Sequence, residues 1–305
     1  MSTSERLPSL SRAPRGAERW AVAGNGWISD DEALELITHG TIDVVGRLPG
    51  ASNATLYAAV SHDGCTAACV YKPTAGERPL WDFPQATLAE REVASYEVSA
   101  AVGFDVVPPT VLREGPFGPG SLQLWVEPED ATDVGAEPGD AVDPPDPGLV
   151  DVVDPSAVPD GWLPVFDAWG MDGEPVVLVH AADARLATIA TFDVLVNNAD
   201  RKAGHLLAAP GDRVVGVDHG LTFHALPKLR TVLWGFAGDE LPDPDLERVR
   251  LLSTALQRED LSGTLARLLA ARELRALERR VSALLEDPRF PLPDPDRHVI
   301  PWPPF

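Results

Sequence analysis

The most constraining feature of this 305-residue chain is a pair of acidic segments joined by a predicted hairpin. The first reads Asn-Asn-Ala-Asp-Arg-Lys-Ala-Gly-His over 197–205, and the second reads Val-Asp-His-Gly over 217–220. Between them, Ala-Pro-Gly-Asp at 209–212 is a turn signal flanked by apolar residues. The hairpin is therefore expected to bring Asp200 and Asp218 near one another. Asp218 ends an apolar strand, where a carboxylate is costly to bury without a cation.

Composition and charge exclude several classes of protein. The formal net charge of −22 opposes binding to nucleic acid and to anionic membranes, because both carry negative phosphates. No apolar run approaches the ~20 residues that span a bilayer, and residues 1–20 lack the apolar core of a secretion signal. Cys65 and Cys69 share one predicted strand, roughly 13 Å apart at about 3.3 Å per residue, too far for a disulfide. We expect a cytoplasmic monomer with reduced thiols and no stable membrane insertion.

The first 127 residues have the pattern of a flexible leader followed by an antiparallel sheet. Residues 1–26 are expected to be flexible, and residues 27–127 are expected to form one lobe. Within this lobe, capping boxes that begin at Ser29 and Thr87 predict two helices. Turn signals and β-forming residues predict five strands, at 41–48, 55–60, 65–71, 106–112 and 121–127.

The composition changes sharply at residue 128. Residues 128–160 contain ten acids and seven prolines but no Lys or Arg, which predicts a disordered acidic insert. A solvated insert is the simplest interpretation, and a docking or autoinhibitory segment is the alternative. Residues 161–305 are expected to form a helical lobe that carries the two acidic segments. Helical spacing is clearest at 184–198, 246–256, 261–269 and 272–285.

Lysine is rare in this chain, and Lys72 is placed where a phosphate-binding lysine would be useful. Three of the 25 basic residues are lysines, and Lys72 ends an apolar strand. Such a lysine can simply extend its ammonium to solvent, but a compact ammonium also suits the phosphates of a nucleotide. Glu92 on the second predicted helix is expected to hold Lys72 in place, with Glu90 or Glu97 as alternatives.

Other nucleotide contacts are expected from turns and main chain, since the sequence has no Walker motif and no true Gly-x-Gly-x-x-Gly. The turn at 49–53 could cap phosphate oxygens with backbone amides and the Ser52 hydroxyl, although a plain hairpin turn explains it equally well. A hinge at 122–127 could offer main-chain groups to adenine. The predicted hinge residues are Gln123, Leu124, Trp125 and Val126.

The two acidic segments supply the candidate catalytic and metal-binding groups. Asp200 is the candidate that orients or deprotonates an attacking hydroxyl, and Asp218 is the candidate metal ligand. His205 is a possible second ligand, because imidazole suits Mn²⁺ better than Mg²⁺. Several histidines near two acids could instead indicate a metallohydrolase, but no recognised ligand spacing such as His-x-His is present.

With these segments in order, the chain resembles the phosphatidylinositol 3-/4-kinase-like branch of the protein-kinase fold. The resemblance is nearest to type II phosphatidylinositol 4-kinases and uncharacterised actinobacterial proteins of that class, and it covers roughly residues 41–235. Its most specific parts are the Asp-Arg and Val-Asp-x-Gly motifs. The residues that carry it are Val70–Pro73, Arg91–Glu92, Val107–Thr110, Leu122–Glu127, Asn197–Arg201, Val217–Gly220 and Phe223.

The resemblance implies an α+β, two-lobed protein-kinase-like fold with a five-stranded antiparallel N-lobe and a mostly helical C-lobe. It implies ATP with Mg²⁺ or Mn²⁺ as cofactors, Lys72 as the ATP-binding lysine, Gln123 to Val126 as the hinge, Asp200 as the catalytic acid and Asp218 as a metal ligand. At His205, type II lipid kinases have Asn, so the chain departs from the family there.

The expected function is transfer of the γ-phosphate of ATP to a hydroxyl acceptor, which could be a lipid, a protein or a small molecule. Two alternatives remain open. A pseudokinase would bind nucleotide, or nothing, and act as a scaffold. Adenylylation of a protein would use the same residues with the nucleotide reversed.

Overall fold

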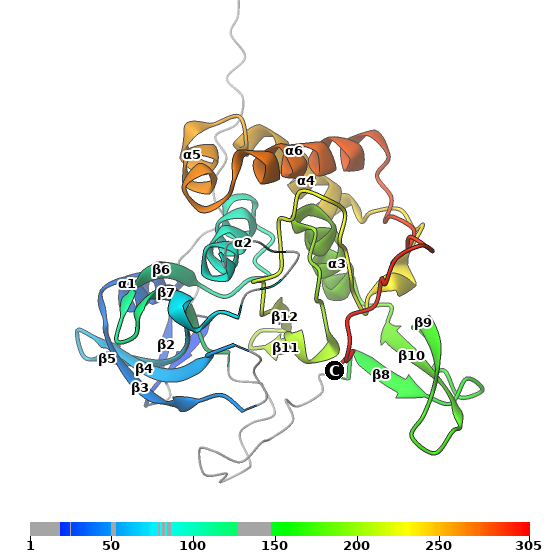
Figure 1. Ribbon diagram of the computed structural model, residues 1–305, viewed down its shortest axis with the longest axis horizontal. Helices are drawn as coiled ribbons and strands as arrows, with labels where there is room; N and C mark the ends of the chain where they lie inside the picture. The colour runs from blue at the N-terminus through cyan, green and yellow to red at the C-terminus, as the bar shows by residue number, and fades with distance from the viewer. Residues whose placement is uncertain are drawn as a thin grey trace, which may run out of the picture.

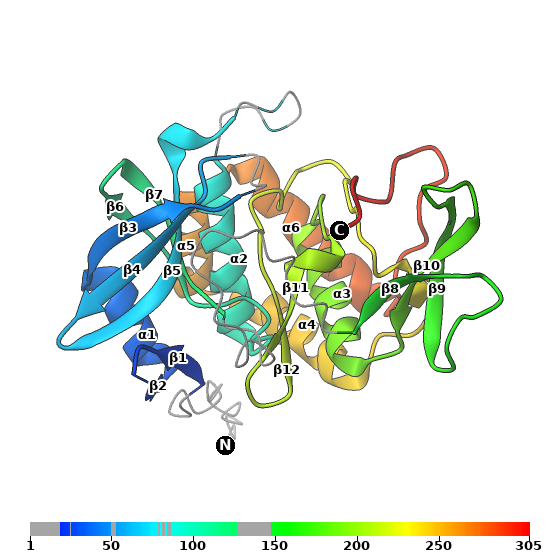
Figure 2. The same ribbon diagram turned by 90° about the horizontal axis from the view of Figure 1, so that it is seen from below.

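The computed structural model describes residues 19–24, 26–49, 53–78, 80, 83, 87–126 and 148–305. They form an α+β fold (Figures 1 and 2). The helices are α1 Asp30–His39, α2 Leu88–Val102, α3 Ala184–Val196, α4 Asp243–Ala255, α5 Glu259–Leu268 and α6 Ala271–Glu286. The strands are β1 Trp20–Val22, β2 Gly26–Ile28, β3 Thr41–Arg47, β4 Leu56–His62, β5 Cys65–Pro73, β6 Thr110–Gly115, β7 Gly118–Leu124, β8 Val150–Val153, β9 Trp162–Trp169, β10 Pro175–Ala181, β11 Leu206–Ala209 and β12 Arg213–Gly216.

The largest sheet contains five strands in the antiparallel order β3-β4-β5-β7-β6, and each overlaps one predicted strand. Two are displaced from their predicted bounds, since β6 begins at Thr110 rather than at residue 106 and β7 at Gly118 rather than at residue 121. In β5, burial alternates along the strand, so Ala67, Cys69 and Tyr71 face a core beneath α1 while Lys72 faces the other way. Lys72 is paired in register with Ser121 of β7. The period-2 pattern thus decides on which face of the sheet the lysine lies.

Both cysteines lie in β5 and are free thiols, as the sequence predicted. Burial raises the pKa of Cys69 to about 12, which keeps this thiol protonated and suits a packing role.

The helix N-termini confirm one predicted capping box and contradict the other. Ser29 and Glu32 form a reciprocal capping box at α1. Thr87 makes no side-chain cap at α2; the Glu77 carboxylate instead accepts the amides of Leu88 at 3.1 Å and Ala89 at 2.9 Å. An ionised carboxylate near the positive end of the helix dipole explains why this distant cap replaces the local threonine.

The expectation of a flexible segment over residues 1–26 is wrong at its C-terminal end. Strand β1 begins at Trp20 and pairs with β2. The Trp20 indole donates to Asp30 at 2.5 Å, and the Arg213 guanidinium lies 4.6 Å from its ring centroid. Burial of this large aromatic ring orders the strand, which a composition argument over the whole leader does not detect. Residues 1–18 lie outside the described part.

The predicted disorder of residues 128–160 is also wrong from Gly148 onward. Strand β8 pairs with β10, which pairs with β9, and Val150 is only 1% exposed. The short apolar run Leu149-Val150 is sufficient to bury one side of β8, although the surrounding composition is acidic. The expected helical region therefore begins with a three-stranded sheet, seen in green at the right of Figure 1. Residues 127–147 lie outside the described part.

The remaining core lies among α2, α3, α4, α5 and α6. The four helices predicted after residue 183 are confirmed within a few residues as α3, α4, α5 and α6. The predicted hairpin between the acidic segments is present as β11 and β12. Figure 2 shows α2, α3 and this hairpin between the five-stranded sheet and the β8–β10 sheet. None of the described helices is both long and apolar enough to cross a lipid bilayer.

Candidate active site

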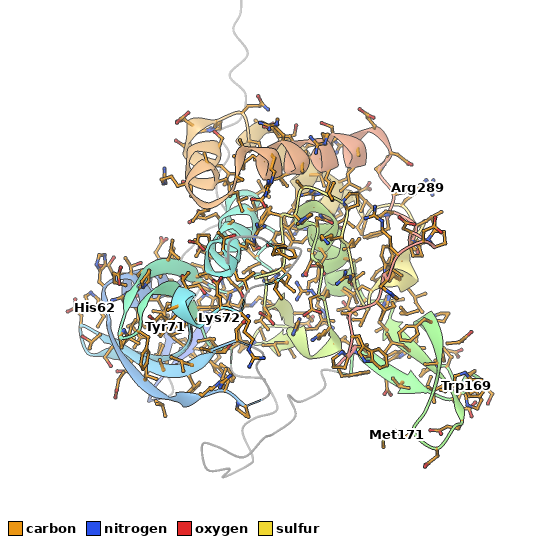
Figure 3. The ribbon with its side chains drawn as sticks, in the orientation of Figure 1. His62, Tyr71, Lys72, Trp169, Met171 and Arg289 are labelled. Carbon is orange, nitrogen blue, oxygen red and sulfur yellow. The ribbon has the colours of Figure 1, made fainter. Side chains whose placement is uncertain are left out.

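Lys72 is the point at which three separate elements meet. Its Nζ lies 2.5 Å from Oε1 of Glu92 on α2 and 2.8 Å from Oδ1 of Asp218, which follows β12. Glu92 is therefore the helix carboxylate that contacts the lysine, rather than Glu90 or Glu97. Figure 3 shows Lys72 between the five-stranded sheet and the central part of the molecule.

Charge pairing keeps this cluster ionised although it is partly desolvated. Desolvation alone would lower the pKa of Lys72, but Asp218 and Glu92 outweigh it and raise that pKa above its ordinary value. Lys72, in turn, holds the pKa of Asp218 far below its usual range. Burial raises the pKa of Glu92, which is 2% exposed, and the lysine opposes this shift. The Asp218 side chain is 51% exposed, so it is the carboxylate that a ligand can reach.

Glu92 also fixes the backbone that carries Asp218. Its second oxygen, Oε2, accepts the amide N–H of His219 at 2.9 Å. Asp218 has a left-handed backbone with φ of 59°, a conformation that costs energy for a residue with a Cβ. A Cβ added at Gly220 would lie 3.3 Å from Cβ of Leu88, so a larger residue there would crowd α2. The segment after β12 is thus held in one strained conformation against α2.

Arg201, the second residue of the Asp-Arg pair, is buried. The side chain is 0% exposed and its guanidinium contacts both carboxylate oxygens of Asp193, at 2.8 and 2.9 Å. It also donates to the Val217 carbonyl at 3.0 Å. A Cβ at Gly216 would lie 2.8 Å from this guanidinium, so the glycine leaves room for it. Arg201 is a structural link between the two acidic segments.

Asp193 is the site-supporting residue that sequence reasoning missed. It is fully buried on α3, within the apolar stretch that predicted the helix. The sequence does contain a signal for it, because Asp193 is an acid among apolar helix residues a few positions before the Asp-Arg motif. A buried acid needs a cationic partner, and Arg201 is the first basic residue that follows it in the sequence.

Asp200 lies beside the cluster with a partly exposed carboxylate. Its Oδ2 is 3.5 Å from Nζ of Lys202, and its amide donates to Asn198 Oδ1 at 3.0 Å. Burial raises its pKa to about 6, with Lys202 opposing the shift and Asp218 adding to it. A carboxylate with this pKa is largely ionised at neutral pH and is a stronger base than an ordinary aspartate.

His205 connects the two aspartates through opposite sides of its ring. Its Nδ1 lies 2.9 Å from the Asp200 carbonyl oxygen, which can only accept, so Nδ1 carries the proton. Burial lowers the pKa of His205 to about 4, which makes the ring neutral at pH 7. Its Nε2 therefore presents a lone pair toward Oδ2 of Asp218 at 3.5 Å. Two acceptors that face one another in this way leave a position suited to a cation.

Three of the four predicted hinge residues make hydrogen bonds within the protein. Gln123 is buried and its amide donates to the Thr110 hydroxyl at 2.8 Å. The main-chain amides of Leu124 and Trp125 donate within the protein, to Pro109 and Ala68, each at 2.9 Å. Among the described residues, the Val126 amide makes no hydrogen bond to a backbone carbonyl. Ser52 lies outside the described residues.

The possible metal site depends on two protein ligands. In the part of the chain that the structure describes, no group of three or more His, Cys, Asp or Glu side chains could hold a metal ion. Asp218 and His205 remain as a pair of potential ligands. This suits a metal completed by the oxygens of a bound phosphate, as is usual where Mg²⁺ accompanies a nucleotide.

The fold and site define an α+β protein with a partly buried Lys-Glu-Asp cluster beside a second aspartate. The chain is 47% identical over 281 residues to Protein Rv2133c of Mycobacterium tuberculosis, covering 91% of this chain and 97% of that protein. It belongs to the same family as Protein Rv2133c. No family model matches the sequence. The relative's name states no activity.

Proposed function

We propose that this protein is an ATP-dependent phosphotransferase of the phosphatidylinositol 3-/4-kinase-like class that acts on a hydroxyl acceptor. In this proposal the five-stranded sheet with α2 is one lobe and the region after residue 148 is the other. One observation carries it: Nζ of Lys72 contacts Glu92 on α2 and Asp218 after β12, which joins groups from both regions. An ammonium held by a buried helix carboxylate beside an exposed aspartate matches the groups with which protein kinases bind nucleotide phosphates and their metal.

Lys72 would bind the phosphate oxygens of ATP while Glu92 keeps the ammonium oriented. Phosphate oxygens would replace Asp218 as one partner of Nζ, because Asp218 is exposed and Glu92 is not. The Val126 amide would donate to the adenine ring, with Gln123 to Trp125 as the strand that positions it. Ser52 remains a predicted phosphate contact.

Asp218 and His205 would hold a divalent cation. The donor set fits, because Asp218 is held ionised by Lys72 and the neutral ring of His205 presents a lone pair toward it. An imidazole ligand favours Mn²⁺ over Mg²⁺, although a carboxylate accepts either. When bound, the cation would neutralise negative charge on the phosphates.

Asp200 would act on the acceptor. Its carboxylate accepts the hydroxyl proton as the acceptor oxygen bonds to the γ-phosphorus and the bond to the bridging oxygen of ADP breaks. A pKa of about 6 leaves Asp200 ionised at neutral pH, ready to accept that proton. Lys202, at 3.5 Å from Asp200, would stay near the transferred phosphate and stabilise its charge.

The test is incubation of the full chain with ATP labelled at the α or γ position, with Mn²⁺ or Mg²⁺. Label transferred only from the γ position supports the proposal, and label only from the α position supports adenylylation. Thermal stabilisation by ATP without transfer supports a pseudokinase. Asp200→Asn should abolish γ-transfer and keep ATP binding, and Asp63→Asn in the β4–β5 turn is the matched control that should change neither. A cytoplasmic monomer remains part of the proposal.

A further inference from the structure

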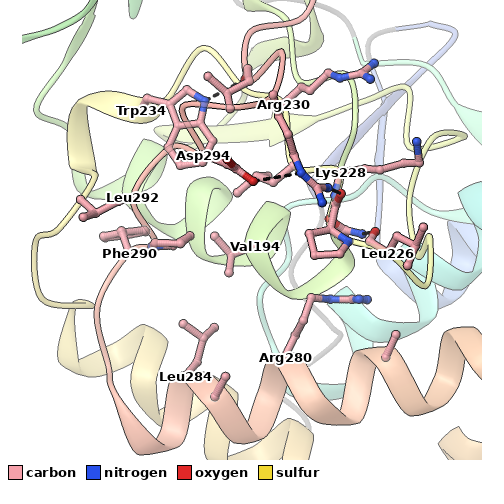
Figure 4. Close-up of a pocket in the computed structure, with 18 of the residues that line it drawn as sticks. Val194, Leu226, Lys228, Arg230, Trp234, Arg280, Leu284, Phe290, Leu292 and Asp294 are labelled. Carbon is pink, nitrogen blue, oxygen red and sulfur yellow. Dashed lines mark hydrogen bonds and ion pairs between the residues drawn. The ribbon is translucent and has the colours of Figure 1, made fainter.

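A large cleft opens on the side of the molecule formed by α3, α6, residues 225–230 and the C-terminal segment. Its volume is about 1540 Å³. Figure 4 shows that its walls are largely apolar and come from several elements. The apolar side chains that line it include Val194, Leu226, Trp234, Leu284 and Phe290. None of the residues of the Lys72 cluster lines this cleft.

Arg280 enters the cleft from α6 without a carboxylate partner (Figure 4). Its Nε donates to the Leu195 carbonyl at 2.7 Å, which fixes the side chain. Its Nη2 is buried and has no hydrogen-bond partner in the described structure. Burial, with a smaller contribution from Arg279, lowers the pKa of Arg280 to about 10, and no acid opposes the shift. A buried guanidinium without an anion is costly, which indicates that an anion belongs there.

The rest of the cleft has the charge that such an anion requires. Six Lys or Arg residues line it against three acids, in a chain whose net charge is −22. Two of these acids have basic partners, since Asp294 pairs with Arg297 at 2.9 Å and Asp287 lies 3.9 Å from Arg289. The lining cations are Lys228, Arg230, Arg279, Arg280, Arg289 and Arg297.

We propose that this cleft binds an organic phosphate, that is, a phosphate monoester that carries an apolar group. The phosphate would accept from the Arg280 guanidinium, and the apolar group would lie against Leu284 and Phe290. A guanidinium fork matches phosphate geometry, and the local excess of positive charge suits a dianion better than a carboxylate. The cleft is a second site, and its ligand is independent of the phosphotransferase proposal.

The test measures binding of hexyl phosphate to the full chain by calorimetry. We expect inorganic phosphate and hexanol each to bind more weakly, because each offers only half of the recognised chemistry. Arg280→Met should weaken hexyl phosphate binding about tenfold or more, the effect of a lost hydrogen bond to a charged group. The matched control is Arg275→Gln, an exposed arginine of α6 outside the cleft, which should bind as the wild type does.

A further variant keeps the test decisive if Arg280→Met fails to fold. Arg279 is an exposed residue of the same cleft, and Arg279→Gln should weaken binding roughly threefold without disturbing the Leu195 contact. Equal affinity in wild type, Arg280→Met and Arg279→Gln would overturn the proposal.

A last arm identifies the source of the phosphate. Vesicles of phosphatidylcholine with added phosphatidic acid present the same monoester on a bilayer. Arg280-dependent binding to these vesicles assigns the site to a lipid headgroup, and Arg280-dependent binding to hexyl phosphate alone assigns it to a soluble metabolite. Failure of both ligands to bind overturns the proposal, whatever the outcome of the ATP experiment.

Discussion

His205 and Asp218 present two hydrogen-bond acceptors to one another, Nε2 and Oδ2, at 3.5 Å. We therefore expect Mn²⁺ to raise the melting temperature more than Mg²⁺ does, because a divalent cation between these atoms removes their repulsion and imidazole prefers Mn²⁺. His205→Asn should reverse this preference by replacing nitrogen with an oxygen ligand. Thermal unfolding with each metal checks both statements, and His39→Asn on α1 is the control. Equal shifts from the two metals in wild type and His205→Asn would remove His205 from the site.

The second prediction concerns the Lys72–Glu92 contact. Lys72→Met leaves the buried Glu92 carboxylate without its cation and should reduce the free energy of unfolding by on the order of 3 kcal/mol. Lys72→Met combined with Glu92→Gln should recover much of this loss, because no buried charge remains. Urea denaturation of the two single variants and the double variant measures the coupling. Strictly additive losses would show that the contact contributes nothing beyond each residue alone.

ATP binding separates the site role of Lys72 from its effect on stability. The double variant Lys72→Met with Glu92→Gln should fold and still fail to gain stability from ATP, since no ammonium remains for the phosphates. Melting temperature with and without ATP is the measurement, and the Glu92→Gln single variant is the comparison. Normal stabilisation of the double variant by ATP would place the nucleotide elsewhere.

The third prediction concerns the buried Arg201–Asp193 pair. Arg201→Met should destabilise the protein by about 3–5 kcal/mol, because Asp193 is left charged in the core. Arg201→Met with Asp193→Leu should be much closer to wild type in stability. The matched control is Arg250→Met, whose exposed pair with Glu247 contributes at most about 0.5 kcal/mol. Similar losses from Arg201→Met and Arg250→Met, measured by urea denaturation, would contradict the structural role.

The sequence allowed the positions of the key side chains to be predicted where local periodicity decides them. Alternation along 65–71 places Lys72 opposite the Cys69 face, and a hairpin turn returns the chain so that Asp218 comes back toward the first acidic segment. Both rules act over a few residues, so they need no knowledge of the rest of the fold.

The features that sequence reasoning missed depend on contacts between distant segments. The acid that caps α2 is Glu77 and not the adjacent Thr87, and the partner of Arg201 comes from α3. Neither follows from local spacing. Strand β8 was missed for a related reason, because its order comes from pairing with β10 while the composition around it is acidic. The charge state of His205 also required the structure, since burial and a carbonyl contact determine it.

The fourth prediction is that stability falls as the pH is lowered below about 6.5, partly through His180. This residue is fully buried on β10, its Nδ1 contacts the Ala181 carbonyl at 2.9 Å, and its ring lies 4.6 Å from that of Phe236. Burial lowers its folded-state pKa below the ordinary value near 6.5. Above pH 6.5 both states are neutral at this position, so its contribution is complete. Below that pH the unfolded chain binds a proton that the folded chain does not, so stability declines until the folded pKa is reached.

His180→Leu removes this titration and should reduce the slope of stability against pH between pH 6.5 and 5 by up to about 1.4 kcal/mol per unit. The change in slope depends only on the one proton that the unfolded chain binds at His180 and the folded chain does not. It is therefore independent of how much packing energy the leucine restores at neutral pH. Urea denaturation of wild type and His180→Leu at several pH values gives the slope. An unaltered slope in His180→Leu would show that His180 binds protons equally in both states, which its burial beside Phe236 argues against.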